Sequence, residues 1–190
     1  MLFSARFSGL AFCAILAIVI IPDTPPVTAA PPKNQHECQT GDRYLFGQQE
    51  RVDQIDEFPT QINALIDSGS TLSSMDARDI KIRRHTNGSL WVHFKVPITR
   101  DKRKLIKMAK PLKRFARVQT HHGTPQKRPV IEANIRLGPV YTRTDFSLTS
   151  RSRFKNQILL GTNTLKNLAI IDTSREFLLK NNCQQVSRYP

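Results

Sequence analysis

Apolar and polar positions alternate in several short runs through the middle of the chain, which is the pattern of half-buried β-strands. The clearest runs are residues 90–96 and residues 130–137, and the second stops at Gly138-Pro139. Residues 142–148 resume the same composition after that turn, and residues 61–66 end in an apolar run before an Asp-Ser-Gly sequence. We therefore predict strands over these four runs.

The C-terminal third continues the β pattern with one interruption. Residues 157–161 form an apolar run that ends in Gly161, and residues 163–168 are the right length for one short helix. Residues 169–171 and 177–179 frame a polar turn. No internal repeat and no long amphipathic helix is evident, so the sequence predicts an all-β fold.

The N-terminus has the pattern of a leader segment. Twelve consecutive apolar residues, 10–21, follow the single positive charge of Arg6. That run has the length of a signal-peptide core and is too short to span a bilayer comfortably. Ala29 and Ala30 suit a signal peptidase, whereas Pro31 directly after them hinders cleavage, so residues 1–30 are a signal peptide or an uncleaved membrane anchor. In both cases we expect an exported, periplasmic protein, tethered to the inner membrane if the segment stays uncleaved.

Proline-rich sequence separates this leader from the rest of the chain. Five of the twelve residues 21–32 are proline, which keeps the chain extended, and we place a linker at residues 31–40. The predicted domain then covers residues 41–181, followed by a tail at 182–190. Cys38 and Cys183 bracket the domain, so in an oxidising compartment they form either a disulfide or two unpaired thiols.

The charge is concentrated in one part of the sequence. The 190 residues carry a formal net charge of +14. Eleven Lys or Arg side chains lie in residues 100–128, against one acid, Asp101. We expect this segment to be one local patch, either a solvated basic face or a site for an anionic envelope or membrane surface. Nucleic acid is an unlikely partner for an exported chain.

The sharpest candidate for chemistry is Asp67, which ends a hydrophobic run and is followed by Ser68, Gly69 and Ser70. In an aspartic peptidase two such carboxylates share one proton in a low-dielectric cleft and activate a water molecule. A serine hydroxyl can hydrogen-bond within the turn, and a glycine lets the backbone approach the second aspartate. By itself Asp-Ser-Gly is also an ordinary turn.

A second motif begins ninety-two residues after the start of the first. Ile-Asp-Ser-Gly-Ser at residues 66–70 and Ile-Leu-Leu-Gly-Thr-Asn at residues 158–163 together resemble the retropepsin pattern. The resemblance extends to a bacterial retropepsin-like aspartic peptidase family, once labelled "ATP-dependent zinc proteases". It is carried by residues 64–77, 117–118, 127–131, 135–138, 160–165, 171–172 and 178–179.

This resemblance implies a small closed β-barrel that acts as a homodimer, with one Asp67 from each subunit. It implies that Leu159, Leu160 and Gly161 pack beneath the catalytic loop. It also implies a flap hairpin over the substrate, which we place between residues 118 and 129, with its tip at His121, His122, Gly123 and Thr124. The substrate would be a protein or peptide, and the basic end of the flap favours acidic or membrane-proximal substrates.

The older label is not supported by the residues. The five histidines include no His-Glu-x-x-His, and no phosphate-binding Gly-x-x-x-x-Gly-Lys sequence is present, so we expect neither a metal nor a cofactor. Asp172 lacks a following glycine and is interpreted as a strand-end residue. Asp76 and Asp79 are interpreted as surface acids of a helix or turn.

Two hypotheses follow for function. The first is an exported aspartic endopeptidase in which two Asp67 carboxylates activate water. The alternative is a non-catalytic envelope binding module that uses the basic segment 100–128 to bind an anionic partner.

Overall fold

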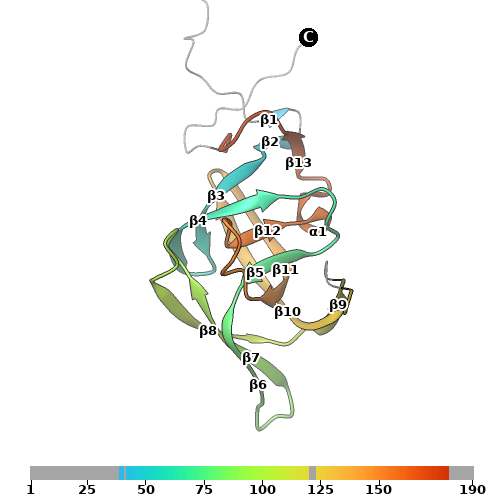
Figure 1. Cartoon of the computed structure of the whole chain (residues 1–190). Helices are drawn as coiled ribbons and strands as arrows, with labels where there is room; N and C mark the ends of the chain where they lie inside the picture. The colour runs from blue at the N-terminus through green and yellow to red at the C-terminus, as the bar shows by residue number, and fades with distance from the viewer. Residues whose placement is uncertain (1–38, 41, 120–122, 180–190) are drawn as a thin grey trace, which may run out of the picture. The chain divides into compact units, whose positions relative to one another are not determined.

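The described part of the chain is built almost wholly from β-strands. The computed structural model describes residues 39–40, 42–119 and 123–179, all within the unit that begins at Lys33. Those ranges contain thirteen strands and one short helix (Figure 1). The strands are β1 (Gln39–Thr40), β2 (Arg43–Gly47), β3 (Gln49–Ile55), β4 (Phe58–Ile66), β5 (Ser73–Asp76), β6 (Arg78–Arg84), β7 (Leu90–Pro97), β8 (Leu105–Pro111), β9 (Arg114–Val118), β10 (Gln126–Leu137), β11 (Val140–Thr149), β12 (Ile158–Leu160) and β13 (Ala169–Asp172). The helix α1 (Thr162–Leu165) lies between β12 and β13 in the chain.

Six of the strands close into a mixed β-barrel. Their order is β11, β5, β12, β4, β3 and β10, and β10 pairs again with β11 to complete the ring. The pairs β5–β11 and β4–β12 are parallel and the other four are antiparallel. The predicted all-β fold with a closed barrel and a short C-terminal helix is thus confirmed, while the homodimer stays a prediction.

The barrel interior is filled by aliphatic side chains from strands whose sequences alternate. On β10 the side chains of Val130, Ile131, Ala133, Ile135 and Leu137 are at most 2% exposed. β5 departs from the pattern, since all four of its residues, Ser-Ser-Met-Asp, are buried although three are polar. The sequence gives no hydrophobic signal for that strand, and it was not predicted.

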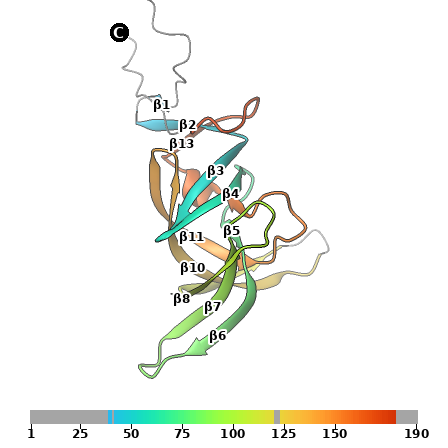
Figure 2. The ribbon, with the colours of Figure 1, turned by 90° about the vertical axis from the view of Figure 1, so that its left-hand side faces the viewer.

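Two three-stranded sheets adjoin the barrel, β1–β2–β13 and β6–β7–β8. Figures 1 and 2 show them at opposite ends of the barrel. The polar turn after β13 is present, but residues 177–179 beyond it form no strand. Instead the backbone N–H of Phe177 donates to the Gln49 carbonyl at 2.8 Å.

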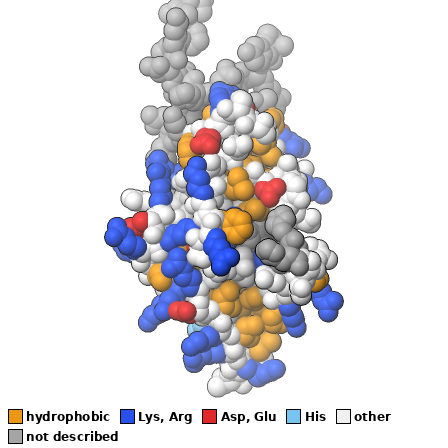
Figure 3. All heavy atoms as spheres, viewed as in Figure 1, with side chains coloured by type: hydrophobic (Ala, Val, Ile, Leu, Met, Phe, Trp, Pro, Cys, Tyr) orange, Lys and Arg blue, Asp and Glu red, His pale blue; other side chains and the backbone are white. Residues whose placement is uncertain are grey.

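The basic segment 100–128 is divided between two of these sheets. β8 pairs with β7, whereas β9 pairs with β10. The change occurs at Leu112 and Lys113, whose N–H groups donate to the carbonyls of Leu90 and Val130 respectively. The segment expected to form one patch is therefore divided between two sheets, and Figure 3 shows Lys and Arg side chains scattered over the face in view.

Several cations of this segment are also partnered within the chain. Lys110 pairs with Asp56 at 2.8 Å and Lys113 with Asp145 at 2.8 Å. The Lys102 ammonium donates to three backbone carbonyls, those of Arg151, Ser152 and Phe154. Part of the positive charge therefore stabilises the fold and is not displayed to a partner.

Some predictions concern residues outside the described ranges. These are the leader at 1–30, most of the linker at 31–40, the tail at 182–190, and the four residues Cys38, Cys183, His121 and His122. Among the residues that the structure describes, no helix is long and apolar enough to cross a membrane.

Candidate active site

Asp67 lies at the point where β4 leaves the barrel. Its backbone N–H donates to the Leu160 carbonyl at 3.0 Å, and its carbonyl accepts the N–H of Ser70 at 3.3 Å. Its carboxylate oxygen Oδ1 accepts the backbone N–H of Gly69 at 2.9 Å. The carboxylate is therefore oriented by the turn that follows it, and Asp67 stays half-buried.

Within this turn the side chain of Ser70 makes a hydrogen bond, whereas that of Ser68 is directed to solvent. The Ser70 hydroxyl donates to the Leu72 carbonyl at 3.2 Å, while Ser68 is exposed. Gly69 is also exposed, and a Cβ on it would lie 3.3 Å from Oδ1 of Asp67. A side chain at Gly69 would therefore crowd the oxygen that the turn positions.

β12 passes beneath this turn. It pairs in parallel with β4, with Leu159 beside Leu65 and Leu160 beside Ile66. A Cβ on Gly161 would lie 2.6 Å from the Ser70 carbonyl oxygen, which is closer than real Cβ contacts. The bare backbone of Gly161 is what allows the two segments to approach this closely.

A hydrogen-bonded cluster behind the turn joins β5, β11 and α1. The Asn163 side-chain oxygen accepts both the N–H and the hydroxyl of Ser73, at 2.8 and 2.7 Å. Its amide nitrogen donates to the Thr144 hydroxyl at 3.0 Å, and Thr164 lies 2.7 Å from the Ser73 hydroxyl. The Ser73 hydroxyl also accepts the Gly161 N–H at 2.9 Å.

This cluster fixes the position of the glycine beneath the turn. Of its members, the sequence analysis singled out Gly161 and quoted Asn163 and Thr164 only as part of a motif. The signal in the sequence is the run of three polar residues after Leu-Gly, Thr162, Asn163 and Thr164, on a helix too short to be stable alone.

A buried acid, Asp76 of β5, and a buried arginine, Arg151, lie close together in the interior. Asp76 is 0% exposed and accepts the backbone N–H of Arg151 at 2.7 Å. The Arg151 guanidinium donates to the Ser74 hydroxyl at 2.9 Å and to the Asn156 carbonyl at 3.1 Å. The interpretation of Asp76 as a surface acid is therefore wrong, because β5 carries it into the interior beside Arg151.

Arg151 also contributes positive charge near the site. Burial lowers the pKa of its guanidinium. The negative charge of Asp76 opposes that shift, the positive charge of Arg128 adds to it, and the negative charge of Asp67 opposes it. Asp79, by contrast, is an exposed acid on β6 that pairs with Lys95 at 2.7 Å. Asp172 ends β13, and the Ser174 and Arg175 side chains hold its pKa at about 2.

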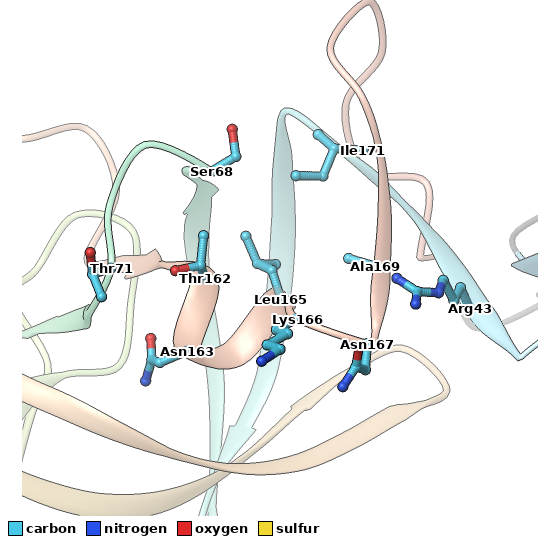
Figure 4. Close-up of a pocket in the computed structure, with 10 residues that line it drawn as sticks. All are labelled: Arg43, Ser68, Thr71, Thr162, Asn163, Leu165, Lys166, Asn167, Ala169 and Ile171. Carbon is cyan, nitrogen blue, oxygen red and sulfur yellow. The ribbon is translucent and has the colours of Figure 1, made fainter.

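The turn after Asp67 borders a groove of about 460 Å³. Figure 4 shows Ser68 and Thr71 on one side of it and the β13 residues Ala169 and Ile171 on the other. Residues of α1 and the turn after it form its floor, and Arg43 lies at its far end. The groove is thus a hollow surface that continues directly from the turn of Asp67.

β9 and β10 form the hairpin where we expected a flap. Val118 pairs with Gln126 and Arg114 with Val130, so the turn falls between residues 119 and 125. Gly123 has a φ of +83°, and no described atom would lie within 4 Å of a Cβ on it, which suits a tight turn. Exposed Thr124 follows it, and the other two tip residues, His121 and His122, lie outside the described ranges.

The hairpin presents positive charge. The Lys127 ammonium lies 4.3 Å from the centroid of the Phe115 ring. Burial lowers the pKa of Arg128, whose guanidinium donates to the Gln126 side chain at 2.9 Å. In the described ranges no group of three or more His, Cys, Asp or Glu side chains is arranged to hold a metal ion.

The family comparison agrees with this geometry. Residues 45–182 match the RimB-like family, described as retropepsin-like aspartic endopeptidase RimB. The chain belongs to this family. The match covers the Asp67 turn, the β9–β10 hairpin and β12.

Other similar proteins extend the comparison. Probable alpha-L-glutamate ligases of Shewanella pealeana and Shewanella halifaxensis are each 29% identical to this chain over 119 residues, which is 62% of this chain and 26% of theirs. The chain thus spans about a quarter of the length of these curated relatives. The crystal structure of Lpg0085, a protein of unknown function from Legionella pneumophila, matches with a TM-score of 0.59 and 23% identity over 72% of this chain and 98% of that one. This last similarity shows the fold alone.

Proposed function

We propose that this protein is an exported aspartic endopeptidase that hydrolyses peptide bonds between two Asp67 carboxylates, one from each subunit of a homodimer. The observation that carries the proposal is the geometry of Asp67 in a chain of this family. Its backbone is bonded to Leu160, its carboxylate to Gly69, and Gly161 supports the turn from below. An oriented, half-buried carboxylate at a strand end is what water activation requires.

The proposed chemistry divides two roles between the paired acids. One carboxylate takes a proton from a bound water while the other, protonated, donates a hydrogen bond to the scissile carbonyl. The water oxygen bonds to the carbonyl carbon, the carbon–nitrogen bond then breaks, and the departing amine takes the proton. No covalent enzyme intermediate forms, and the pair titrates as a unit.

The groove beside the turn supports the dimer in this proposal. It is lined by Ser68 and Thr71 of the turn and by Lys166 and Asn167 after α1. A second copy seated there would bring its own Asp67 turn next to the first. Each chain supplies one such aspartate, and the site is incomplete without the second.

The positive hairpin supports a proposal about substrate. Arg117, Lys127 and Arg128 lie on the strands that flank the tip, and a hairpin that closes over a peptide would bring these charges close to it. Peptides rich in Asp and Glu would be favoured electrostatically. The relatives that share this domain are named as probable glutamate ligases, so a glutamate-rich peptide is the first substrate to test.

The decisive experiment replaces the proposed catalytic acid. Asp67→Asn should lower peptide cleavage by about 10²–10⁴-fold, because it removes proton transfer while keeping the side-chain shape. Asp79→Asn is the matched control, since Asp79 is an exposed acid on β6 and should leave cleavage unchanged. Undiminished cleavage by Asp67→Asn would sink the proposal, and salt-sensitive binding without any cleavage would favour the non-catalytic binding module.

A further inference from the structure

The β6–β7–β8 sheet has two unlike faces. On β7 the side chains of Val92, Phe94 and Val96 are at most 3% exposed, and they pack in the core. Side chains alternate between the two faces of a strand, so Trp91, His93 and Lys95 lie on the opposite, outer face.

Aromatic rings are in contact on the outer face, at the end of the sheet nearest the β6–β7 turn. The His85 ring stacks on the Trp91 ring with centroids 4.8 Å apart and planes 18° apart. The His93 ring lies 6.4 Å from His85 at 28°. The Trp91 indole N–H is directed to the Ser89 hydroxyl at 3.1 Å, which fixes the ring plane. The result is an ordered set of flat rings on the exterior of the protein.

Cations of all three strands lie on the same face as these rings. Arg83 pairs across from Trp91 and Lys81 across from His93, both on β6. Lys107 of β8 lies across from Lys95 of β7. Asp79 pairs with Lys95, so it offsets only one of these four positive charges. The outer face therefore combines stacked rings with a net positive charge.

We propose that the outer face of β6–β7–β8 binds an anionic polysaccharide, with sugar rings stacked against the His85–Trp91 pair and acidic groups paired with Lys81, Arg83 and Lys107. The C–H face of a pyranose ring is flat and apolar enough to stack on an indole. Cations on β6 and β8 are separated by two strand spacings, about 10 Å, so a linear polymer with a charge on each sugar can contact both.

The face suits this ligand better than two other anionic partners. A membrane surface calls for several aliphatic side chains that insert, whereas the aliphatic side chains of β7 are directed into the core and Leu105 of β8 is the one large exposed aliphatic side chain on this face of the described strands. A single-stranded nucleic acid would use the same rings and charges. The leader-like N-terminus, however, favours an exported protein, which would meet envelope polysaccharide first.

This site is separate from the proposed catalysis. Asp67 follows β4, in the barrel, whereas the rings and cations lie on a sheet at one end of it (Figures 1 and 2). Polysaccharide binding would hold the protein near its substrates without occupying the groove beside Asp67. The inference does not depend on the peptidase activity.

Trp91 is the only tryptophan of the sequence, so its fluorescence reports directly on this face. Titration of the whole chain with polygalacturonate should change the Trp91 emission, and added salt should weaken binding. The triple variant Lys81→Gln/Arg83→Gln/Lys107→Gln should weaken binding about tenfold or more, because three ion pairs are lost. Dextran, an uncharged polysaccharide, should bind neither protein. Circular dichroism checks that each variant is folded.

The matched control removes the same charge from other surfaces. Arg117→Gln/Lys127→Gln/Arg153→Gln should change the polygalacturonate affinity by about twofold or less. Equal weakening by both triple variants would overturn the site, since it would mean that only net charge matters. Tighter binding of a single-stranded oligonucleotide or of phosphatidylglycerol vesicles, abolished by the first triple variant, would overturn the choice of ligand. Asp67→Asn should leave polygalacturonate binding intact, so failure here and failure of the peptidase are distinguishable.

Discussion

At Gly161 the absence of a side chain decides how closely two distant segments approach. A Cβ there would meet the Ser70 carbonyl oxygen at 2.6 Å and the Leu72 carbonyl carbon at 3.0 Å. Both neighbours are backbone atoms of the segment that follows Asp67, so neither can rotate away. The turn that orients Asp67 therefore depends on a glycine that lies far from it in the sequence.

Gly161→Ala should both destabilise the fold and reduce peptide cleavage. Overpacking of this kind costs about 1–3 kcal/mol, and relief requires the turn of Asp67 to move. Thermal unfolding and cleavage rates would be measured together. Gly88→Ala is the control, because Gly88 has a φ of +82° but nothing within 4 Å.

Gly88→Ala should cost about 1–2 kcal/mol of stability and leave cleavage per folded molecule unchanged. If Gly161→Ala retained full cleavage per folded molecule, the glycine would matter for stability alone. Its assigned role beneath the active-site turn would then be wrong.

At the scale of elements, one buried carboxylate joins three segments of the chain. Glu50 of β3 is 0% exposed and accepts the N–H of Gly47 at 2.7 Å. It also accepts the N–H groups of Leu178 and Leu179, at 3.0 and 3.1 Å. The C-terminal stretch after β13 is thereby fixed to β2 and β3 without forming a strand itself.

The titration of Glu50 gives this connection a pH dependence. Burial raises the pKa of its carboxyl group, although its three backbone N–H donors act in the opposite direction. The folded protein therefore holds this proton more tightly than the unfolded chain does. The contribution of Glu50 to stability is complete below the pKa that its carboxyl group has in the unfolded chain. It declines as pH rises through the higher pKa of the folded protein.

Glu50→Gln should lower the free energy of unfolding by about 1–3 kcal/mol, because an amide cannot accept three N–H donors. It should also remove the pH dependence of stability that comes from Glu50. The difference in free energy of unfolding between the wild type and the variant should therefore shrink as pH rises from about 4 to about 8. Urea unfolding across that range measures both effects. Glu57→Gln, at an exposed acid nearby, should change neither. A difference in free energy of unfolding that stays constant with pH would contradict the raised pKa of Glu50.

At the scale of the whole molecule, activity depends on a second copy in the proposed function. Thr71→Arg places a long cation in the groove beside the Asp67 turn, where Thr71 is exposed. This variant should sediment as a monomer and lose cleavage at concentrations where the wild type is active. Thr173→Arg, in the exposed turn after β13, is the matched control and should keep both properties.

Sedimentation velocity and cleavage would be measured over the same concentration series. A dimeric enzyme loses specific activity on dilution as its subunits separate. An active monomer, or specific activity that is independent of concentration, would rule out the shared pair of Asp67 residues.

Local sequence predicted the elements whose burial alternates. The runs at 90–96 and 130–137 became β7 and β10, because alternation reports directly which side chains face a core. β5 was missed because Ser73, Ser74 and Asp76 are polar, and their burial is permitted only by partners elsewhere in the chain. Asp76 became an interior residue because Arg151, seventy-five positions later, donates to it.

The sequence by itself determined the family, the catalytic candidate Asp67 and the glycine partner at Gly161, since motif and spacing suffice for these. Only the tertiary structure decided that segment 100–128 divides between two sheets. It alone also brought Asn163 against Ser73 and assembled His85, Trp91 and the surrounding cations on one face. The physical reason is that motifs and alternation are local, whereas barrel closure and strand register depend on packing between distant segments. A charge can be counted in a sequence, but the strand that carries it and its partners decide where it acts.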